Sequence, residues 1–367
     1  MAQGIGRAAV GIGALVAALV LGPAPAHAAA GAWSEVPVPN PDVQFSYLTA
    51  TDARGDADAW AVGYVQPPGV APFLPIALHW NGTAWASTTV PQLGDGTILY
   101  GVSESPAGDA WAVGNFFTHP PGYHVQSNAA ALHYSGGAWT ATTVPDSGLL
   151  FGVAAVSPTN AWAVGNGVKH WDGTAWSDVT TPSPGGTGPG SLIAISARSA
   201  DDVWAVGSFS PRRHVTAPFA LHFDGTTWSV VPVPTGVALQ AVVAGGPNDA
   251  WAVGNTTDAT QQPATLHWDG TAWTQVPAPT VPAGGSLRGV SARAGNDVWA
   301  IGLGFTGEAG EVTALTLHWN GTAWSAVPVN TPAVSPQLMA VTARPGTTHV
   351  WATGAQQPGV PLVLERH

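Results

Sequence analysis

Short segments of alternating apolar and polar residues run along the whole chain, separated by turn residues. The phrase DAWAVG, or a close variant of it, occurs seven times, and LHW followed by TAW stands downstream of several copies. A short apolar run such as LRGVSA or LMAVTA lies upstream of each copy. Alternation over about four to eight residues indicates half-buried β-strands. Each repeat therefore predicts four short strands, which we name A, B, C and D in chain order.

The spacing of these repeats predicts the architecture. One tryptophan marks strand B in each copy, at intervals of 42 to 52 residues: Trp60, Trp111, Trp162, Trp204, Trp251, Trp299 and Trp351. Four-stranded units repeated at about 40 to 50 residues are typical of β-propeller blades. The last copy stops after its strand C, while the segment around Trp33 looks like a strand D without a blade. We predict an all-β, seven-bladed β-propeller over residues 29–367, in which the N-terminal strand completes the last blade (1+3 closure).

The connection between strands C and D carries the strongest local signal. Asparagine or aspartate is followed there by glycine in five copies: Asn81-Gly82, Asp172-Gly173, Asp224-Gly225, Asp269-Gly270 and Asn320-Gly321. These residues tolerate the two positive φ angles of a two-residue type I′ hairpin. We therefore expect this turn at each of the five positions.

Composition and charge narrow the functional classes. The chain has 45% hydrophobic and 8% charged residues, with 46 glycines and 33 prolines, which favours many short strands in a folded core. It has no cysteine, so disulfides, thiolate metal sites and a cysteine nucleophile are excluded. Acidic residues outnumber basic ones by 21 to 10, which disfavours nucleic acid and anionic membranes as partners.

The N-terminus predicts export. Arg7 precedes a small apolar run, and Ala26 and Ala28 provide the arrangement that a signal peptidase uses. We interpret residues 1–28 as a signal peptide that is removed, and we expect a secreted, extracellular protein. The apolar run is shorter than the roughly 20 residues that span a bilayer, and no later segment is long enough.

These features together resemble the kelch repeat, found in the galactose-oxidase propeller and in exported bacterial propellers. The shared features are a strand B that ends in glycine, a variable loop, an aromatic residue on strand C and a tryptophan on strand D. The resemblance covers residues 29–367, but single glycines such as Gly63 stand where kelch blades have two, and the aromatic-to-tryptophan spacing is shorter. It implies the fold and no activity, because the copper site of the oxidase needs a cysteine crosslinked to tyrosine.

Residues that recur in every blade are interpreted as scaffold. The 18 tryptophans all fall on strands B, C or D, so we expect them to pack in the core. Strand C lies about 10 Å outside the innermost strand, so its histidines cannot converge on one metal ion. We expect structural hydrogen bonds from them, and no metal or cofactor: His79, His133, His170, His222, His267 and His318. The arginines after strand A and the aspartates before strand B, such as Arg54 and Asp58, are interpreted as scaffold, with the aspartates capping the A–B turn.

A candidate site is predicted where the repeat breaks. The distance from the strand B tryptophan to the strand D tryptophan varies from 14 to 28 residues, so the B–C loops differ most. These loops are long in blades 2 and 4 and very short in blade 3 between them. We therefore predict a notch over blade 3 that binds a ligand, walled on one side by Phe117, His119, Tyr123 and His124 and on the other by Arg212, Arg213 and His214.

Two classes of function remain open. The favoured one is a non-catalytic, monomeric binding protein that recognises a glycan, a cell-wall polymer or another protein through its B–C loops. The alternative is an extracellular hydrolase or lyase acting on polysaccharide. An enzyme of that kind would need a convergent carboxylate pair, or a tyrosine or histidine base with an arginine. No spacing in the sequence marks such a set, so no catalytic residue is assigned.

Overall fold

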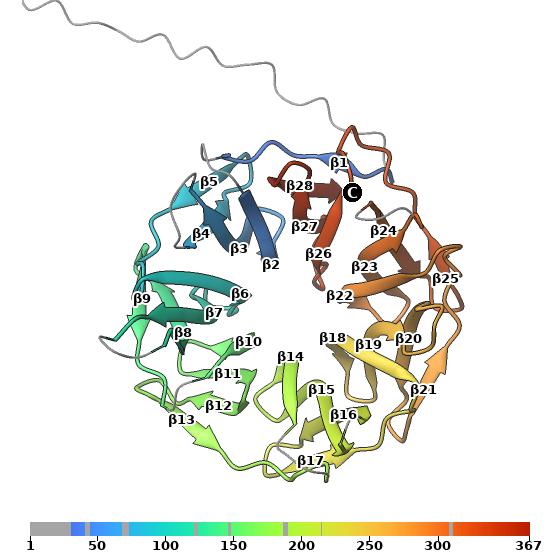
Figure 1. The fold of residues 1–367 in the computed structure, drawn as a ribbon, viewed down its shortest axis with the longest axis horizontal. Coiled ribbons are helices and arrows are strands. Elements are labelled where there is room, and N and C mark those ends of the chain that lie inside the picture. Colours follow the sequence, from blue (N-terminus) through green and yellow to red (C-terminus); the bar gives the residue numbers. More distant parts are fainter. Residues whose placement is uncertain are drawn as a thin grey trace, which may run out of the picture.

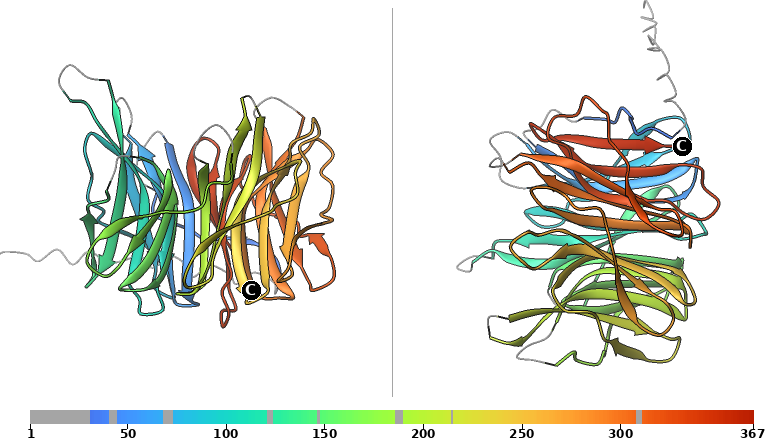
Figure 2. Two further views of the ribbon diagram at one scale, coloured as in Figure 1. Left: turned by 90° about the horizontal axis from the view of Figure 1, so that it is seen from below. Right: turned by 90° about the vertical axis from the view of Figure 1, so that its right-hand side faces the viewer.

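Seven four-stranded sheets stand as blades around a central channel (Figure 1; Figure 2). The computed structural model describes residues 31–40, 45–67, 73–120, 124–145, 148–185, 190–213, 215–307 and 311–367. Neighbouring strands in each sheet are antiparallel. The predicted all-β, seven-bladed propeller is confirmed. Within the described ranges no helix is long and apolar enough to cross a membrane, and the predicted signal peptide lies outside those ranges.

The four strands of each blade follow one another from the channel outward. Strand A, the innermost, is β2 (Phe45–Gly55), β6 (Gly96–Glu104), β10 (Leu150–Ser157), β14 (Ser191–Ser199), β18 (Val237–Gly246), β22 (Gly285–Ala294) and β26 (Gln337–Thr342). Strand B is β3 (Asp58–Gln66), β7 (Ala110–Thr118), β11 (Asn160–Gly165), β15 (Asp202–Arg212), β19 (Asp249–Thr256), β23 (Asp297–Phe305) and β27 (Val350–Gln356). Strand C is β4 (Leu74–Trp80), β8 (Gln126–Ser135), β12 (Gly167–Trp171), β16 (Val215–Phe223), β20 (Pro263–Trp268), β24 (Val312–Trp319) and β28 (Val360–Arg366). Strand D is β5 (Trp85–Thr88), β9 (Ala138–Thr142), β13 (Trp176–Val179), β17 (Trp228–Val231), β21 (Trp273–Val276), β25 (Trp324–Ala326) and, in blade 7, β1 (Ser34–Glu35).

Blade 7 combines both ends of the described chain. Its strand order is β1-β28-β27-β26, and Ser34 and Glu35 of β1 pair with Glu365 and Leu364 of β28. The edge of β28 is thereby covered by a strand that comes from the other end of the chain.

Tryptophans form the interfaces between blades. The strand B tryptophan of each blade packs against the strand D tryptophan of the next blade, as Trp60 does against Trp139, with ring centroids 5.0 Å apart at 79°. The seam of blade 7 follows the same rule, because Trp299 packs edge-on against Trp33 at 5.6 Å. All fourteen tryptophans of strands B and D are at most 8% exposed. The prediction that these residues pack in the core is confirmed.

The strand C histidines also serve the scaffold. In blade 1 the His79 ring stacks on Trp60 at 4.3 Å, and its Nε2 lies 2.7 Å from a carboxylate oxygen of Asp58. Asp58 and Trp60 are two residues apart on β3, so their side chains lie on the same face of the sheet. His79 pairs with Trp60 across the two strands and therefore lies on that face as well. The same contact, at 2.8 to 3.1 Å, joins the strand C histidine to aspartate or asparagine in blades 2 to 6. The predicted structural role of the histidines is confirmed.

The aspartate has a different role from the predicted turn cap. Asp202 binds His222 of strand C and also Arg198 before the turn, at 2.9 and 2.7 Å. Asp202 thus links three strands of one blade instead of capping the turn backbone. The pairing with the histidine and the arginine lowers the pKa of Asp202, although burial opposes this.

The predicted type I′ turn is wrong for the Asx-Gly hairpins. Trp80 pairs with Trp85, and the N–H of Asn81 donates to the carbonyl of Ala84, so the central residues are Gly82 and Thr83. Of these two residues only Gly82 has a positive φ, at 90°, and the Asn81 side chain accepts hydrogen bonds from the N–H groups of Thr83 and Ala84. The asparagine therefore precedes the turn and stabilises it through its side chain.

Candidate functional site

Every strand A carries a β-bulge at the residue after its leucine. In blade 1 the pairing with β3 passes from Leu48 to Ala50 and skips Thr49, and the six other blades show the same skip. The repeated glycine of strand B faces this bulge. A Cβ on Gly63 would lie 1.8 Å from the carbonyl oxygen of Tyr47, and the equivalent distances in the other blades are 1.7 to 2.0 Å. The glycine of the DAWAVG phrase is required because the bulged strand approaches so closely.

The bulged residues come together at the channel. We call them the bulge ring: Thr49, Tyr100, Phe151, Ile193, Gln240, Arg288 and Met339. All seven line a pocket of about 220 Å³ toward the face that carries the B–C loops, which we call the loop face. No two of them are alike, although each follows a leucine and precedes alanine or glycine. Sequence reasoning missed this ring, and its variability inside a repeated phrase is the signal that could have found it.

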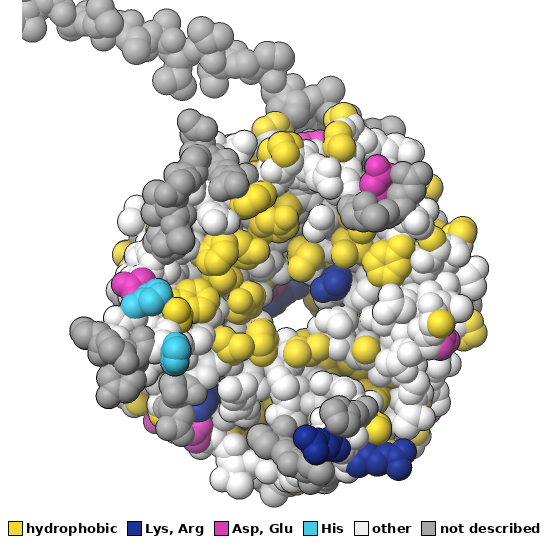
Figure 3. Space-filling view, in the orientation of Figure 1, with side chains coloured by type: hydrophobic (Ala, Val, Ile, Leu, Met, Phe, Trp, Pro, Cys, Tyr) yellow, Lys and Arg dark blue, Asp and Glu magenta, His cyan; other side chains and the backbone are white. Residues whose placement is uncertain are grey.

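One side of this channel mouth is aromatic. Tyr100 and Phe151 of the ring lie 5.6 Å apart, centroid to centroid. Tyr47 stacks on Tyr64 at 5.6 Å, and Tyr64 meets Phe73 edge-on at 5.2 Å. Burial raises the pKa of the Tyr64 and Tyr100 hydroxyls, so these groups stay protonated at neutral pH. In Figure 3, which looks onto the loop face, apolar side chains gather around the central opening, most of them over β2, β6 and β10.

The other side of the channel mouth carries a cation. Arg288 comes from blade 6, across the ring from blades 2 and 3, and lines the pocket at the mouth. Its Nε has no hydrogen-bond partner among the described residues. The Nε is itself buried, so a carboxylate would have to bind through the other N–H groups of the guanidinium. The mouth therefore combines apolar and aromatic faces with one cationic side chain.

The residues of the predicted notch occupy two separate places. Phe117 and His119 line a pocket of about 170 Å³ with Phe73 of blade 1 and Asp95, which precedes β6. His119 Nδ1 lies 2.8 Å from the Asp95 carboxylate. The loop of blade 2 therefore presents these two side chains toward blade 1, and His124 is exposed nearby in the chain.

The opposite wall of the predicted notch is less enclosed. Arg212 and Arg213 are exposed at the tip of the β15–β16 hairpin, while Tyr123 and His214 lie outside the described residues. A pocket of about 390 Å³ does lie beside the short loop of blade 3. Its described lining comes from residues 166–167, 181–184 and 190–192 and from Phe219 and Leu221, not from the two arginines.

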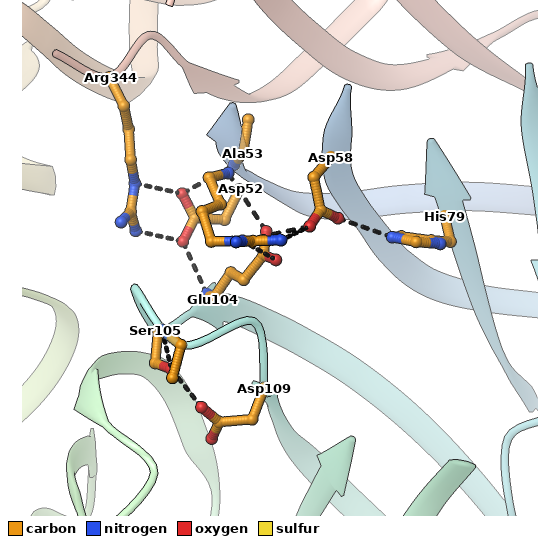
Figure 4. A network of polar contacts seen from close by, with 10 residues as sticks. Asp52, Ala53, Asp58, His79, Glu104, Ser105, Asp109 and Arg344 are labelled. Atoms are coloured by element: carbon orange, nitrogen blue, oxygen red, sulfur yellow. Dashed lines mark hydrogen bonds and ion pairs between the residues drawn. The ribbon is translucent and has the colours of Figure 1, made fainter. Parts of the chain in front are cut away.

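A cluster of charged groups lies at the opposite end of the channel, which we call the turn face (Figure 4). Arg54 binds the carboxylates of both Asp58 and Glu104, and Asp52 accepts the N–H of Glu104 at 2.8 Å and pairs with Arg344. Burial, followed by the nearby negative charge of Asp58, raises the pKa of Glu104 to about 8. Its side chain is 0% exposed.

Glu104 therefore does not supply the catalytic carboxylate that an enzyme would need, because a polysaccharide cannot reach a fully buried side chain. The sequence did contain a signal for this cluster. Glu104 stands at a position where all six other blades have alanine: Ala53, Ala155, Ala197, Ala244, Ala292 and Ala343. This cluster was not predicted from the sequence, in which Arg54 and Asp58 were interpreted as scaffold.

Comparison with known proteins supports the fold. No protein-family description and no curated protein match the chain. Among solved structures, YCF48 bound to D1 peptide is similar at 14% identity and a TM-score of 0.60, over 91% of this chain and 96% of that chain. YCF48 from Cyanidioschyzon merolae is 17% identical with a TM-score of 0.58, over 92% of this chain and 99% of that chain. A GH74 xyloglucanase from Xanthomonas campestris is 15% identical with a TM-score of 0.57, over 90% of this chain but 55% of that chain.

At these identities the likeness shows the seven-bladed fold alone. The neighbours include a propeller that binds a peptide and a propeller that belongs to a glycan-degrading enzyme. Both a binding role and a polysaccharide enzyme are thus compatible with the scaffold, and the residues at the site must decide between them.

Proposed function

We propose that this protein is a binding protein that holds a segment of another protein at the channel mouth on its loop face. The observation that carries the proposal is the bulge ring, where seven equivalent positions hold seven different side chains. The flanking positions repeat leucine and small residues, so packing of the blades does not require this diversity. A set of equivalent positions that differs from blade to blade where the seven blades converge is suited to one specific ligand.

The chemistry of the ring favours a peptide over a glycan. Phe151, Ile193 and Met339 are apolar, and Tyr100 adds an aromatic face, which suits aliphatic or aromatic side chains of a ligand. Arg288 suits a carboxylate, either of an acidic side chain or of a chain terminus. YCF48 bound to D1 peptide is a precedent for peptide binding by a propeller of this kind.

The loops of blades 2 and 4 extend the proposed surface outward. Phe117 and His119 continue the aromatic side of the mouth through their shared pocket with Phe73. Arg212 and Arg213 would attract acidic residues on either side of the bound segment, since exposed charges mainly steer association. The notch residues thus belong to the rim of the proposed site and the bulge ring to its centre.

The proposed setting is outside the cell. It is supported by the leader-like residues 1–28. We also propose that the chain is related to exported kelch-like propellers, because its repeated phrases resemble the kelch repeat.

The test begins with a peptide library displayed against the purified protein, followed by titration of the selected peptide. Arg288→Ala and Phe151→Ala should each weaken binding at least about 10-fold, corresponding to about 1.4 kcal/mol. Gln275→Ala, an exposed position on the outer strand β21, is the matched control and should leave affinity unchanged. Circular dichroism of each variant checks that the fold is retained.

A double variant, Arg212→Ala with Arg213→Ala, tests the rim. It should slow association, most clearly at low salt, and change stability by no more than about 0.5 kcal/mol because both residues are exposed. Unchanged affinity in Arg288→Ala and Phe151→Ala would refute the channel mouth as the site. Glycans bound on an array, or a polysaccharide cleaved by the purified protein, would instead support the enzyme or glycan-binding alternative.

A further inference from the structure

Blade 7 inverts the polar pair that the other blades share. Where blade 1 has Asp58 before strand B, blade 7 has His349, and where strand C has His79, blade 7 has Glu365. The register is the same, because Trp351 pairs with Glu365 as the tryptophan of blade 1 pairs with its histidine. The pair is therefore kept with its two partners exchanged.

A second histidine joins this inverted pair. His367 occupies the position that holds the turn-forming asparagine or aspartate in five other blades. One oxygen of Glu365 lies 2.5 Å from His349 Nδ1 and the other lies 3.5 Å from His367 Nε2. The two imidazole rings are 4.3 Å apart, centroid to centroid, at 76°. The exchange of the two partners explains why His349 and Glu365 are in contact, but it does not explain why the side chain of His367 also lies beside Glu365.

We propose that His349, Glu365 and His367 bind a divalent transition-metal ion of the zinc type. The three ligand atoms lie within 4.8 Å of one another. Ligand atoms of a tetrahedral zinc site, each about 2.0 to 2.2 Å from the ion, are about 3.3 to 3.5 Å apart. His367 is exposed, and binding of the ion would require its side chain to move closer and the 2.5 Å contact of His349 with Glu365 to lengthen. Two imidazoles and one carboxylate suit zinc, copper or nickel, whereas calcium and magnesium prefer oxygen ligands alone.

The surroundings hold two of the three ligands in place. Asp56 of blade 1 accepts hydrogen bonds from the backbone N–H groups of Thr348 and His349, at 2.7 and 3.2 Å. Glu365 lies on β28 and pairs with Ser34 of β1. Outer contacts of this kind orient metal ligands and increase affinity. The ion would therefore connect β28 to the turn before β27, beside the strand that completes blade 7.

This site is independent of the channel mouth and would have a structural role. A chain without cysteines cannot use disulfides to fasten the joint between its two ends. A metal ion that binds only the folded protein stabilises it by an amount that grows with the logarithm of the ion concentration once this exceeds the dissociation constant. We therefore expect zinc to raise the melting temperature.

The test uses the full chain without a histidine tag and Zn²⁺ alone as the probe. Isothermal titration should show one ion per chain, and the melting temperature should rise with Zn²⁺ and return with a chelator. His367→Ala should weaken binding at least about 10-fold, since even outer-shell changes cost about 10- to 100-fold. Glu365→Gln should weaken it as well, and Co²⁺ should give the visible absorption of a tetrahedral site in the parent chain but in neither of these two variants.

His79→Ala is the matched control, because it removes a histidine that is paired with aspartate in blade 1. It should lower stability but leave zinc affinity and the zinc-dependent rise unchanged. Absence of stoichiometric zinc binding to the parent chain would overturn the proposal. Equal binding by the parent and by His367→Ala would also overturn it, and that variant keeps the pair of His349 with Glu365, so it should fold.

Discussion

Replacement of Glu104 by glutamine should flatten the pH dependence of stability on the alkaline side. The Glu104 side chain is fully buried, and it shares the Arg54 guanidinium with Asp58. Burial raises the pKa of Glu104 to about 8 in the folded protein, above the ordinary value of 4.5. Between these two pH values the folded state holds a proton that the unfolded state has released. Stability from this group is therefore greatest below pH 4.5 and is lost as pH rises toward 8.

The size of the effect follows from linkage. One full proton of difference changes the free energy of unfolding by about 1.4 kcal/mol per pH unit, or about 2.7 kcal/mol between pH 5.5 and 7.5. Titration is spread over Glu104 and Asp58 because they share one arginine, so we expect about 1 to 2 kcal/mol over this interval. Other groups that titrate in the same interval, such as His349 with its raised pKa, are common to both proteins and cancel in the difference.

The assay is urea unfolding of the parent and of Glu104→Gln at half-unit steps from pH 5 to 9. The parent should lose stability relative to the variant as pH rises. Glu104→Ala provides a second comparison, because alanine occupies this position in the other six blades. If the curves run parallel, or if the parent gains on the variants with rising pH, then Arg54 keeps Glu104 ionised and the reasoning is refuted.

Two further predictions concern the scaffold. Gly254→Ala should lower the free energy of unfolding by more than about 3 kcal/mol, because its Cβ would lie 1.8 Å from a backbone carbonyl oxygen of the bulge. Gly136→Ala has open space around it but a φ of 61°, so it should lower the free energy of unfolding by about 1 to 2 kcal/mol; equal losses in denaturant unfolding would contradict the account of the bulge. Deletion of residues 29–40 should lower the melting temperature strongly or cause aggregation, because it removes Trp33 and exposes the edge of β28; a shortened chain as stable and monomeric as one starting at residue 29 would show that β1 is dispensable.

The scaffold could be predicted from the sequence because its residue pattern is repeated in each blade. Each blade packs its two faces against two neighbours in the same way, so the same residue types must recur at the same positions. The tryptophans of strands B and D and the histidine of strand C could be assigned for this reason, as Trp60 and His79 illustrate. The loop-length contrast among blades 2, 3 and 4 was also readable, but it did not show that Phe117 turns toward blade 1.

The local sequence was not enough to predict the turn type where one dipeptide is compatible with more than one backbone conformation. Asn81-Gly82 is compatible with the centre of a type I′ turn, and only the pairing of Trp80 with Trp85 places the asparagine before the turn. In blade 2 the hairpin contains Gly136 and Gly137, and both have positive φ. The position of glycine within the turn depends on the register of strands C and D, which is set by packing.

The sequence by itself determined the strands, their number and the residues that hold the blades together, because these follow from a pattern repeated within each blade. Tertiary structure alone decided which residues meet at the channel and at the seam. Tyr100 and Arg288 are far apart in the chain and become parts of one ring only when the blades close. The side chains of Tyr100 and Arg288 point to the channel because each stands at a bulge that skips one pairing with strand B. Glu104 becomes a buried acid only because Arg54 and Asp58 of the neighbouring blade pack over it. Contacts of this kind arise between blades, and no periodicity within a single blade encodes them.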